Sequence, residues 1–308
     1  MADASQHSMT RREMLAASAG MALVALDGSA APALGAAAQP QAAPVPQPPG
    51  SPLGAGRLKQ SVCRWPYGSI PLPEFCKAIK AMGLTGIDLL QPAEWPVARD
   101  AGLVVSMGYP ADRRDFIATG FNDRAHHKQL IDELTRTIPL AQAAGVANVI
   151  TMFGNRAGIS DADGIAACIE GLRQVAPVAE AHGVTVCVEL LNSKVDHKDY
   201  MGDHTAFGVK VMEGVASPRV KLLYDIYHMQ IMEGDIIHTL HDSIAHIGHI
   251  HTGGVPGRHE IDDTQELNYH AVARALADLG FAGFVAHEFM PTGDPLTSLR
   301  GAVAICTV

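Results

Sequence analysis

Short apolar runs alternate with longer amphipathic stretches from position 58 to the end of the chain. The short runs are rich in Val, Ile and Leu, as expected for strands buried in a parallel sheet. The longer stretches repeat their apolar positions every three or four residues, which predicts helices that cover such a sheet. The predicted strands are 58–64, 86–90, 103–107, 146–153, 184–191, 220–227, 247–252 and 284–289, and the helical stretches include 73–82, 123–144, 161–182, 205–215, 235–244 and 269–279.

Glycines follow several of the predicted helices. Gly83, Gly183 and Gly280 each come directly after a helical stretch and shortly before a strand. A glycine in the left-handed conformation is a common end of a helix. The repeated order of helix, glycine and strand predicts one α/β domain at 57–308, a (β/α)8 TIM barrel, which usually has about 250 residues. An open doubly wound sheet is the alternative, but no GxGxxG motif follows the first strand.

The N-terminal residues have a different composition. Arg11 and Arg12 precede a weakly apolar stretch of small residues, which is typical of a twin-arginine signal peptide at 1–38. The stretch at 39–56 is rich in Pro, Ala and Gly and is interpreted as a disordered linker. The alternative is an Ala-rich extension without export. The signal predicts transfer by the twin-arginine machinery to the periplasm or beyond, and its apolar run is too short for a stable membrane span.

Charge and cysteine content narrow the function classes. The 23 Lys and Arg against 32 Asp and Glu give a net charge of −9, which opposes nucleic-acid binding. The five cysteines form no CxxC pair, so buried thiols are expected rather than disulfides or a zinc knuckle. Cys187 lies two residues before Glu189, so both side chains should point into the barrel. The sequence leaves open whether the chain forms a homo-oligomer.

Four polar side chains close four consecutive predicted strands. Glu189, Asp225, His251 and Glu288 end strands five to eight, one βα unit apart. Because barrel active sites lie at the carboxyl ends of the strands, these groups should converge on one half of the barrel mouth. Each residue alone has an ordinary alternative, a helix N-cap or a hydrogen-bonded core histidine. Together they predict a site for one divalent metal ion, with Mn²⁺, Mg²⁺ or Co²⁺ favoured and Zn²⁺ not excluded.

Four segments then identify a family resemblance. LKQSVCRW at 58–65, VELLN at 188–192, YDIYHMQ at 224–230 and HIHTGGVPGRHE at 249–260 resemble hydroxypyruvate isomerase-like proteins of the xylose isomerase-like barrel superfamily, which also contains ketose 3-epimerases. The resemblance covers the chain from position 58 onward. It implies that the four residues bind the metal and that Glu189 and Glu288 also form the acid/base pair.

Further residues are candidates for substrate contacts. His228 resembles the family's hydrogen-bond donor to a substrate oxygen, with a supporting role beside a ligand carboxylate as the alternative. Arg258 lies among glycines after strand seven, where its guanidinium could bind a substrate carboxylate. Weaker candidates are Lys194, His197, Glu260 and Trp65.

These features predict an isomerase for a small hydroxy-carbonyl substrate, of the hydroxypyruvate to tartronate semialdehyde type, that acts through an enediolate. A ketose 3-epimerase and a keto-sugar or glycoside lyase would use the same site. A DNA-repair endonuclease is disfavoured by the acidic charge. A binding protein would have no reason to keep both glutamates.

Overall fold

The computed structural model describes residues 56–308, and the predicted signal and linker fall outside this part except for Gly56. Eight parallel strands form one sheet in the order β1-β8-β7-β6-β5-β4-β3-β2. A parallel bridge between Cys63 and Asp88 links the two ends of that order, so the barrel is nearly closed. The strands are β1 (Lys59–Val62), β2 (Gly86–Leu90), β3 (Val104–Gly108), β4 (Asn148–Met152), β5 (Thr185–Leu190), β6 (Val220–Asp225), β7 (Ile247–Thr252) and β8 (Phe284–His287).

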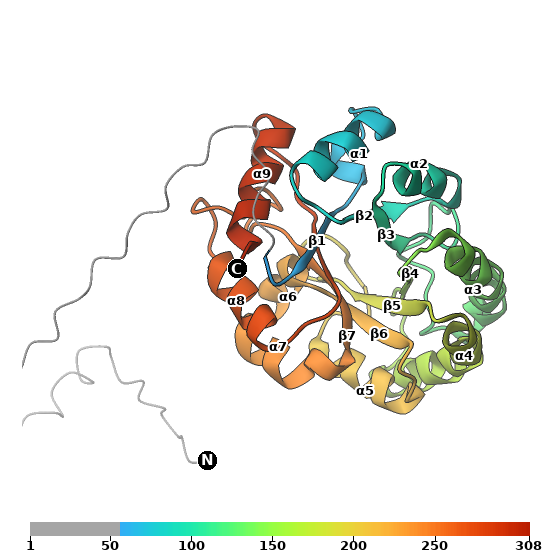
Figure 1. The fold of residues 1–308 in the computed structure, drawn as a ribbon. Coiled ribbons are helices and arrows are strands. Elements are labelled where there is room, and N and C mark those ends of the chain that lie inside the picture. The colour runs from blue at the N-terminus through green and yellow to red at the C-terminus, as the bar shows by residue number, and fades with distance from the viewer. Residues whose placement is uncertain (1–55) are drawn as a thin grey trace, which may run out of the picture. The chain divides into compact units, whose positions relative to one another are not determined.

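Helices surround the strands (Figure 1). They are α1 (Leu72–Ala81), α2 (Trp95–Asp100), α3 (Arg124–Ala144), α4 (Asp161–His182), α5 (Thr205–Val215), α6 (Ile226–Met232), α7 (Ile236–Ser243), α8 (Tyr269–Asp278) and α9 (Pro295–Cys306), with short 3-10 turns at Trp65–Tyr67, Pro92–Glu94 and Ile244–His246. The prediction of a single (β/α)8 barrel is confirmed. Every predicted strand and helix overlaps one in the structure.

The glycine caps are confirmed as well. Gly83, Gly183 and Gly280 have φ values of 96°, 67° and 70°. These left-handed values carry a steric cost for other residues, which explains why glycine ends these helices.

Several predicted strand boundaries differ from the structure by one or two residues, and strand six is the most informative case. Strand six was expected to run to position 227, but β6 ends at Asp225 and α6 begins at Ile226. The Asp225 side chain accepts a hydrogen bond from the backbone N–H of His228 at 3.2 Å. This N-cap satisfies a donor that the first turn of a helix leaves free, and it turns the chain directly from strand to helix.

The core lies between the strands and the helices that cover them. All five cysteines are buried and free, as predicted. Cys187 is fully buried. Its Sγ packs against Gly248 of β7, since a Cβ atom added to that glycine would lie 3.3 Å from the sulfur. Within the described residues no helix combines the length and the hydrophobicity that crossing a membrane requires.

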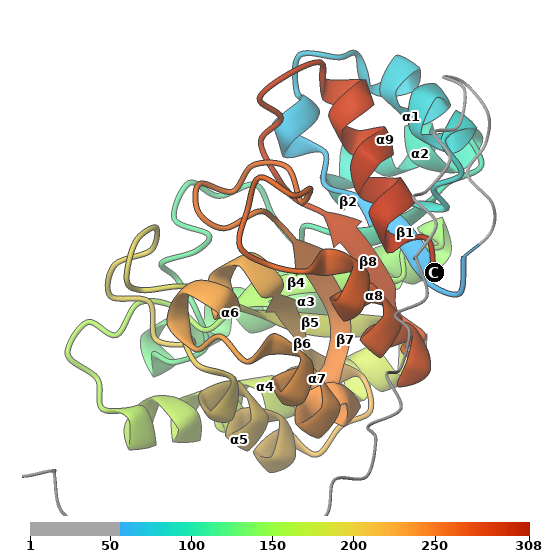
Figure 2. The same ribbon diagram turned by 90° about the vertical axis from the view of Figure 1, so that its left-hand side faces the viewer.

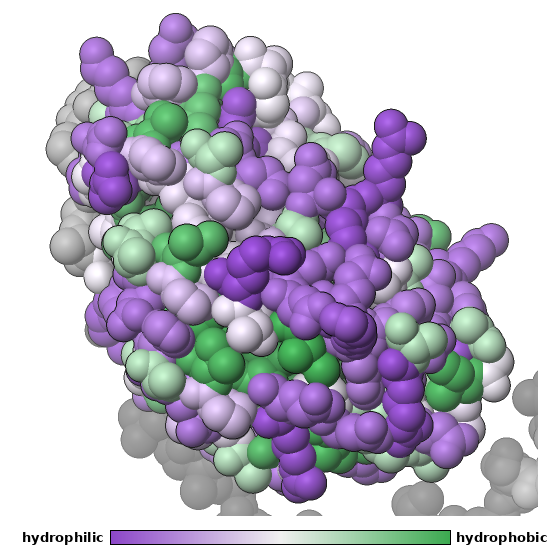
Figure 3. Space-filling view, turned by 90° about the vertical axis from the view of Figure 1, so that its right-hand side faces the viewer, coloured by the Kyte–Doolittle hydropathy of each residue, from purple (hydrophilic) through white to green (hydrophobic). Residues whose placement is uncertain are grey.

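Longer loops gather at one end of the barrel, where those after β4 and β5 extend from the carboxyl ends of their strands (Figure 2). Seen from the side opposite to that of Figure 2, the molecule has a mainly hydrophilic surface with small apolar patches (Figure 3). The helices therefore direct their apolar faces inward. A binding site is expected at the end of the barrel where the long loops lie.

Candidate active site

The four strand-end residues meet in one cluster. Glu189, Asp225, His251 and Glu288 each offer a ligand atom, and these atoms all lie within 4.8 Å of one another. All four residues are buried. The equal spacing along the sequence therefore corresponds to a convergence in space, as the barrel geometry requires.

His251 is at the centre of this cluster. Its Nδ1 lies 2.7 Å from Glu288 Oε2, 3.4 Å from Glu189 Oε1 and 3.9 Å from Asp225 Oδ2. The same nitrogen is buried and has no hydrogen-bond partner with acceptable geometry. An imidazole nitrogen surrounded by three carboxylates in this way is suited to share a cation with them.

Asp88 holds His251 from below. The Nε2–H of His251 donates to Asp88 Oδ2 at 2.9 Å, and the Nε2–H of His249 donates to the same oxygen at 3.1 Å. Asp88 and both histidines are fully buried. Because Nε2 of His251 is engaged with Asp88, Nδ1 is the nitrogen that faces the cluster and that could bind a metal ion.

The charge of Asp88 is stabilised by this arrangement. Burial acts to raise the pKa of the Asp88 carboxyl, but His249 and His251 outweigh it and hold the pKa below its usual value. Ser106 Oγ also donates to Asp88, and Cys63 Sγ lies 3.7 Å from it. Cys63, Asp88 and His251 are close enough to hold an ion themselves. The shared oxygen of Asp88 already accepts two N–H groups, so we interpret this group as support for His251.

The charge balance of the cluster also fits a cation. Burial raises the pKa of Asp225 to about 7, with Arg258 as the main opposing influence. Burial acts in the same direction on Glu288, but Arg258 and His251 together keep the pKa of Glu288 well below its usual value. Three buried carboxylates face one guanidinium, and a divalent cation would balance the remaining charge.

Arg258 reaches into the cluster from the loop after β7. Its Nη2 lies 2.6 Å from Glu288 Oε2 and 3.1 Å from Asp225 Oδ2. The guanidinium also lies 5.6 Å from the Trp65 ring centre and 5.2 Å from that of Tyr227. These contacts fix the planar group beside the cluster, where its positive charge could also face a carboxylate in the cavity.

His228 presents a hydrogen-bond donor, because Asn192 sets its tautomer. The Oδ1 of Asn192 accepts the backbone N–H groups of Val195 and Asp196 at 3.0 and 2.9 Å, which fixes the orientation of the amide. The Asn192 Nδ2–H then donates to His228 Nδ1 at 2.6 Å. The proton of His228 is therefore on Nε2, a fully buried atom without a partner that lies 3.7 Å from Asp225 Oδ2.

The neutral state of His228 follows from its surroundings. Burial lowers the pKa of His228 well below its usual value, and the nearby charge of Arg258 lowers it further. Its Nε2–H is thus a neutral donor aimed at the cluster, in agreement with either role expected for it.

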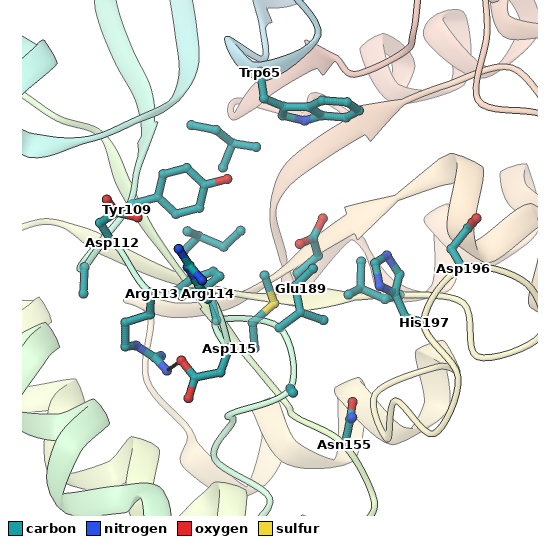
Figure 4. A pocket seen from close by; sticks show the side chains of 18 of the residues that line it. Trp65, Tyr109, Asp112, Arg113, Arg114, Asp115, Asn155, Glu189, Asp196 and His197 are labelled. Carbon is teal, nitrogen blue, oxygen red and sulfur yellow. Dashed lines mark hydrogen bonds and ion pairs between the residues drawn. The ribbon is translucent and has the colours of Figure 1, made fainter. Parts of the chain in front are cut away.

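The remaining candidates separate into two groups. Trp65 and His197 line the cavity above the cluster. Trp65 Nε1–H donates to Glu288 Oε1 at 2.6 Å, and the His197 ring lies 5.3 Å from the His228 ring. Figure 4 shows both side chains beside the open space above Glu189.

Lys194 and Glu260 do not line this cavity. Lys194 Nζ donates to the backbone oxygens of Ile231 and Met232 at the end of α6. Glu260 accepts hydrogen bonds from Thr292 and Ser298. The side chains of both residues are therefore engaged with neighbouring loops and helix ends.

The cavity has a volume of about 680 Å³. Glu189, Glu288, His228 and Arg258 line the side of the cavity next to the cluster. Asp225 and His251 lie beneath, since both are almost completely inaccessible to solvent. A molecule in the cavity could therefore contact the two glutamates directly, whereas Asp225 and His251 are reached only through the cluster.

The class of this protein follows from two features. It is a nearly closed eight-stranded barrel, and it has a buried cluster of carboxylates and an imidazole at its strand ends. Residues 96–303 match the family described as xylose isomerase-like TIM barrel. The chain belongs to this family.

Two curated relatives and one solved structure are among the most similar proteins. A putative hydroxypyruvate isomerase of Danio rerio is 32% identical over 110 residues, which are 36% of this chain and 40% of that protein. A 2-oxo-tetronate isomerase of Cupriavidus necator is 40% identical over 84 residues, 27% of this chain and 32% of that protein. The matches thus cover well under half of these relatives. A Brucella melitensis structure titled AP endonuclease, family 2, has a TM-score of 0.71 and 24% identity, covers 79% of this chain and 97% of its own, and shows the fold alone.

Proposed function

We propose that this protein is a divalent-metal-dependent isomerase that moves a proton between adjacent carbons of a small hydroxy-carbonyl compound. The observation that carries the proposal is the buried cluster of Glu189, Asp225, His251 and Glu288, with two glutamates that also line the cavity. Relatives named as hydroxypyruvate and 2-oxo-tetronate isomerases support a keto-acid substrate.

The two glutamates have the positions that proton transfer needs. Glu189 comes from β5 and Glu288 follows β8, so they approach the cavity from different parts of the ring. One carboxylate removes the proton beside the substrate carbonyl, and a carboxylic acid returns a proton to the neighbouring carbon. Trp65 and Arg258 hold Glu288 by hydrogen bonds at 2.6 Å each, which fixes its orientation toward the substrate.

Two further groups face the charge that develops on the substrate oxygens. The Nε2–H of His228 donates a hydrogen bond to one oxygen, and the Arg258 guanidinium binds an acidic substituent of the substrate. A divalent cation held by the four cluster residues would supply additional positive charge next to those oxygens. The oxygen and nitrogen ligands favour Mn²⁺, Mg²⁺ or Co²⁺, with Zn²⁺ as a further candidate.

A ketose 3-epimerase is the second candidate function, and a keto-sugar or glycoside lyase would begin with the same proton abstraction. The cavity volume of about 680 Å³ favours these alternatives, because it exceeds what a three-carbon acid fills. A substrate panel separates the candidates. Conversion of hydroxypyruvate to tartronate semialdehyde supports the isomerase, inversion of a free ketose at C3 supports the epimerase, and release of an alcohol from a keto-glycoside supports the lyase.

We also propose that the chain is exported through the twin-arginine route and acts in the periplasm. The pair Arg11 and Arg12 before an Ala-rich stretch supports this proposal. That route carries folded proteins, which agrees with loading of a metal before export. Substitution of both arginines by lysine should keep the protein inside the cell, and periplasmic recovery of that variant would contradict the proposal.

A further inference from the structure

Tyr227 makes three contacts that join different segments at the mouth of the barrel. Its ring centre lies 5.0 Å from that of His228, at an interplanar angle of 68°, and 5.2 Å from the guanidinium carbon of Arg258. Its hydroxyl donates a hydrogen bond to Asp196 Oδ2 at 2.8 Å. Tyr227 and His228 belong to α6, whereas Arg258 lies in the loop after β7 and Asp196 in the loop after β5. One side chain therefore connects three segments that border the cavity.

Asp196 accepts a second hydrogen bond on the same oxygen, and this bond fixes Asn192. One Nδ2 hydrogen of Asn192 is donated to Asp196 Oδ2 at 2.7 Å, and the other is donated to His228 Nδ1 at 2.6 Å. The Asn192 Oδ1 is already occupied by two backbone N–H groups. Both ends of the amide are thus engaged, so Asp196 helps to set the direction in which Asn192 meets the His228 ring.

These residues form a closed ring of contacts, from Asp196 to Asn192, His228, Tyr227 and back to Asp196. An exposed carboxylate usually contributes little to a structure. Asp196, however, accepts from Tyr227, which is only 4% exposed, and from the fully buried Asn192. Burial and the charge of Asp196 raise the pKa of Tyr227, so its hydroxyl remains a donor. Bonds to a charged acceptor are stronger than neutral ones, and bonds in a network support one another.

Arg258 packs closely against the ring that Asp196 holds. A Cβ atom added to Gly253 would lie 3.2 Å from Tyr227 Cβ and 3.3 Å from Arg258 Cγ, so this glycine leaves just enough room for both side chains. The guanidinium has the Tyr227 ring at 5.2 Å and the Trp65 ring at 5.6 Å. A tyrosine that is anchored through its hydroxyl therefore limits where the guanidinium can move.

We propose that Asp196 and Tyr227 are positioning residues that hold His228 and Arg258 as one unit. The inference rests on the proposed proton-transfer function, in which His228 and Arg258 face the substrate. Asp196 lies at the edge of the cavity beside His197 (Figure 4). It acts through Asn192 and Tyr227, so its effect on the reaction is indirect.

A double-mutant cycle tests the pair. The measured quantity is kcat for deuterium incorporation from D2O into hydroxypyruvate, or into D-fructose if only the ketose exchanges, by the Mg²⁺-loaded protein. Tyr227→Phe keeps the ring and loses the hydrogen bond to Asp196, and should lower kcat about threefold. Asp196→Ala loses both bonds and should lower kcat about tenfold. The double variant should match Asp196→Ala alone, because the bond between the two residues is already absent there.

The ¹⁵N chemical shifts of the His228 ring give a readout that a general loss of stability does not move. In Asp196→Ala they should shift toward a mixture of tautomers, because Asn192 is held less firmly. Asp196→Asn keeps an oxygen acceptor for Tyr227 and Asn192, and should restore most of kcat and the wild-type ¹⁵N shifts.

Two variants serve as controls. Asp199→Asn removes a charge from the same loop, but Asp199 accepts the backbone N–H of Ala157 and does not line the cavity. Tyr67→Phe removes a hydroxyl that is buried without a hydrogen-bond partner in the described residues and lies outside the cavity lining. Both variants should keep the wild-type kcat and His228 shifts.

The outcomes separate the inference from the proposed function. Unchanged kcat and unchanged His228 shifts in Asp196→Ala would overturn the inference and leave the isomerase proposal standing. Losses that multiply in the double variant would also overturn it, because the two residues would then act independently. Absence of exchange in the wild type would contradict the proposed function. The ¹⁵N shifts would then decide on the positioning pair: movement in Asp196→Ala supports it, and no movement overturns it.

Discussion

The two halves of the barrel carry different kinds of residues. Strands β5 to β8 and their ends supply Glu189, Asp225, His251 and Glu288, whereas β2, β4 and the loop after β3 supply a far wall of the cavity with mixed apolar and charged residues. One half therefore carries the residues of the proposed chemistry, and the other half forms the wall that faces them across the cavity. Asp88 is the exception, because it lies on β2 and supports His251 of β7.

The largest effect is expected at the two glutamates of the β5–β8 half. Glu189→Gln and Glu288→Gln should each lower turnover on every substrate by about 10³-fold or more, because each removes a proton-transfer group. Steady-state kinetics measure the change. Glu213→Gln, an exposed position on α5, is the control and should match the wild type. Near-normal turnover in either active-site variant would sink the acid/base assignment.

Asp88→Asn tests whether a residue of the other half affects metal binding. Asp88 lies on β2 but supports His251, one of the proposed metal ligands. An asparagine oxygen is an uncharged and therefore weaker acceptor for the Nε2–H groups of His249 and His251, so His251 is held less firmly with Nδ1 toward the cluster. Affinity for Mn²⁺, measured by isothermal titration calorimetry, should fall about 10- to 100-fold. Asp100→Asn, on the surface of α2, should leave it unchanged. Equal affinities in both variants would show that Asp88 only fills the core.

Much of the fold and the four cluster residues could be predicted from the sequence, for a physical reason. A carboxylate or imidazole that closes an apolar run must lie at a strand end, and parallel strands bring such ends together. Asp88 lies in the apolar run GIDLL, and a carboxylate within a buried strand is a signal that could have identified it as a candidate. Its partners, however, are 161 and 163 residues away, and local spacing does not identify such contacts.

Loop side chains are harder to predict. Lys194 and Glu260 are near the cluster in sequence but bond to the end of α6 and to the loop after β8. Asp196 lies in a run of polar and charged loop residues and was not among the candidates, because such runs are usually solvated surface. The direction of a loop side chain depends on backbone turns that the hydrophobic pattern does not contain.

Asn192 offers a smaller test within the reactive half. Asn192→Ala removes the hydrogen bond to His228 Nδ1, so the Nε2–H tautomer loses its preference, and kcat should fall about tenfold. The ¹⁵N chemical shifts of His228 should move toward a mixture of tautomers. Asn268→Ala removes a comparable helix-capping amide at α8 and controls for stability. Unchanged ¹⁵N shifts in Asn192→Ala would show that another group sets the tautomer.

The smallest effect is expected at the boundary between the two halves, where β8 pairs with β1. His287 of β8 donates through Nε2 to Gln60 of β1 at 2.9 Å, and burial lowers the pKa of His287 to about 3. Below the unfolded pKa of about 6.5 the unfolded chain binds a proton that the folded chain does not. The free energy of unfolding should therefore decrease as the pH is lowered below about 6.5, and this residue should contribute about 1.4 kcal/mol per pH unit.

Urea unfolding between pH 7 and pH 5 measures this slope. His287→Gln keeps a neutral side chain in both states and should show a shallower slope than the wild type. Parallel slopes would contradict the assignment of a neutral, buried His287.

The central claim is that a metal and two glutamates transfer a substrate proton. Deuterium incorporation from D2O, followed by NMR, tests it most directly, with Mg²⁺-loaded and EDTA-treated protein offered hydroxypyruvate and then ketoses. The account predicts incorporation that depends on the metal and disappears in Glu189→Gln and Glu288→Gln. No exchange with any divalent metal, or exchange that survives both metal removal and these substitutions, would contradict it.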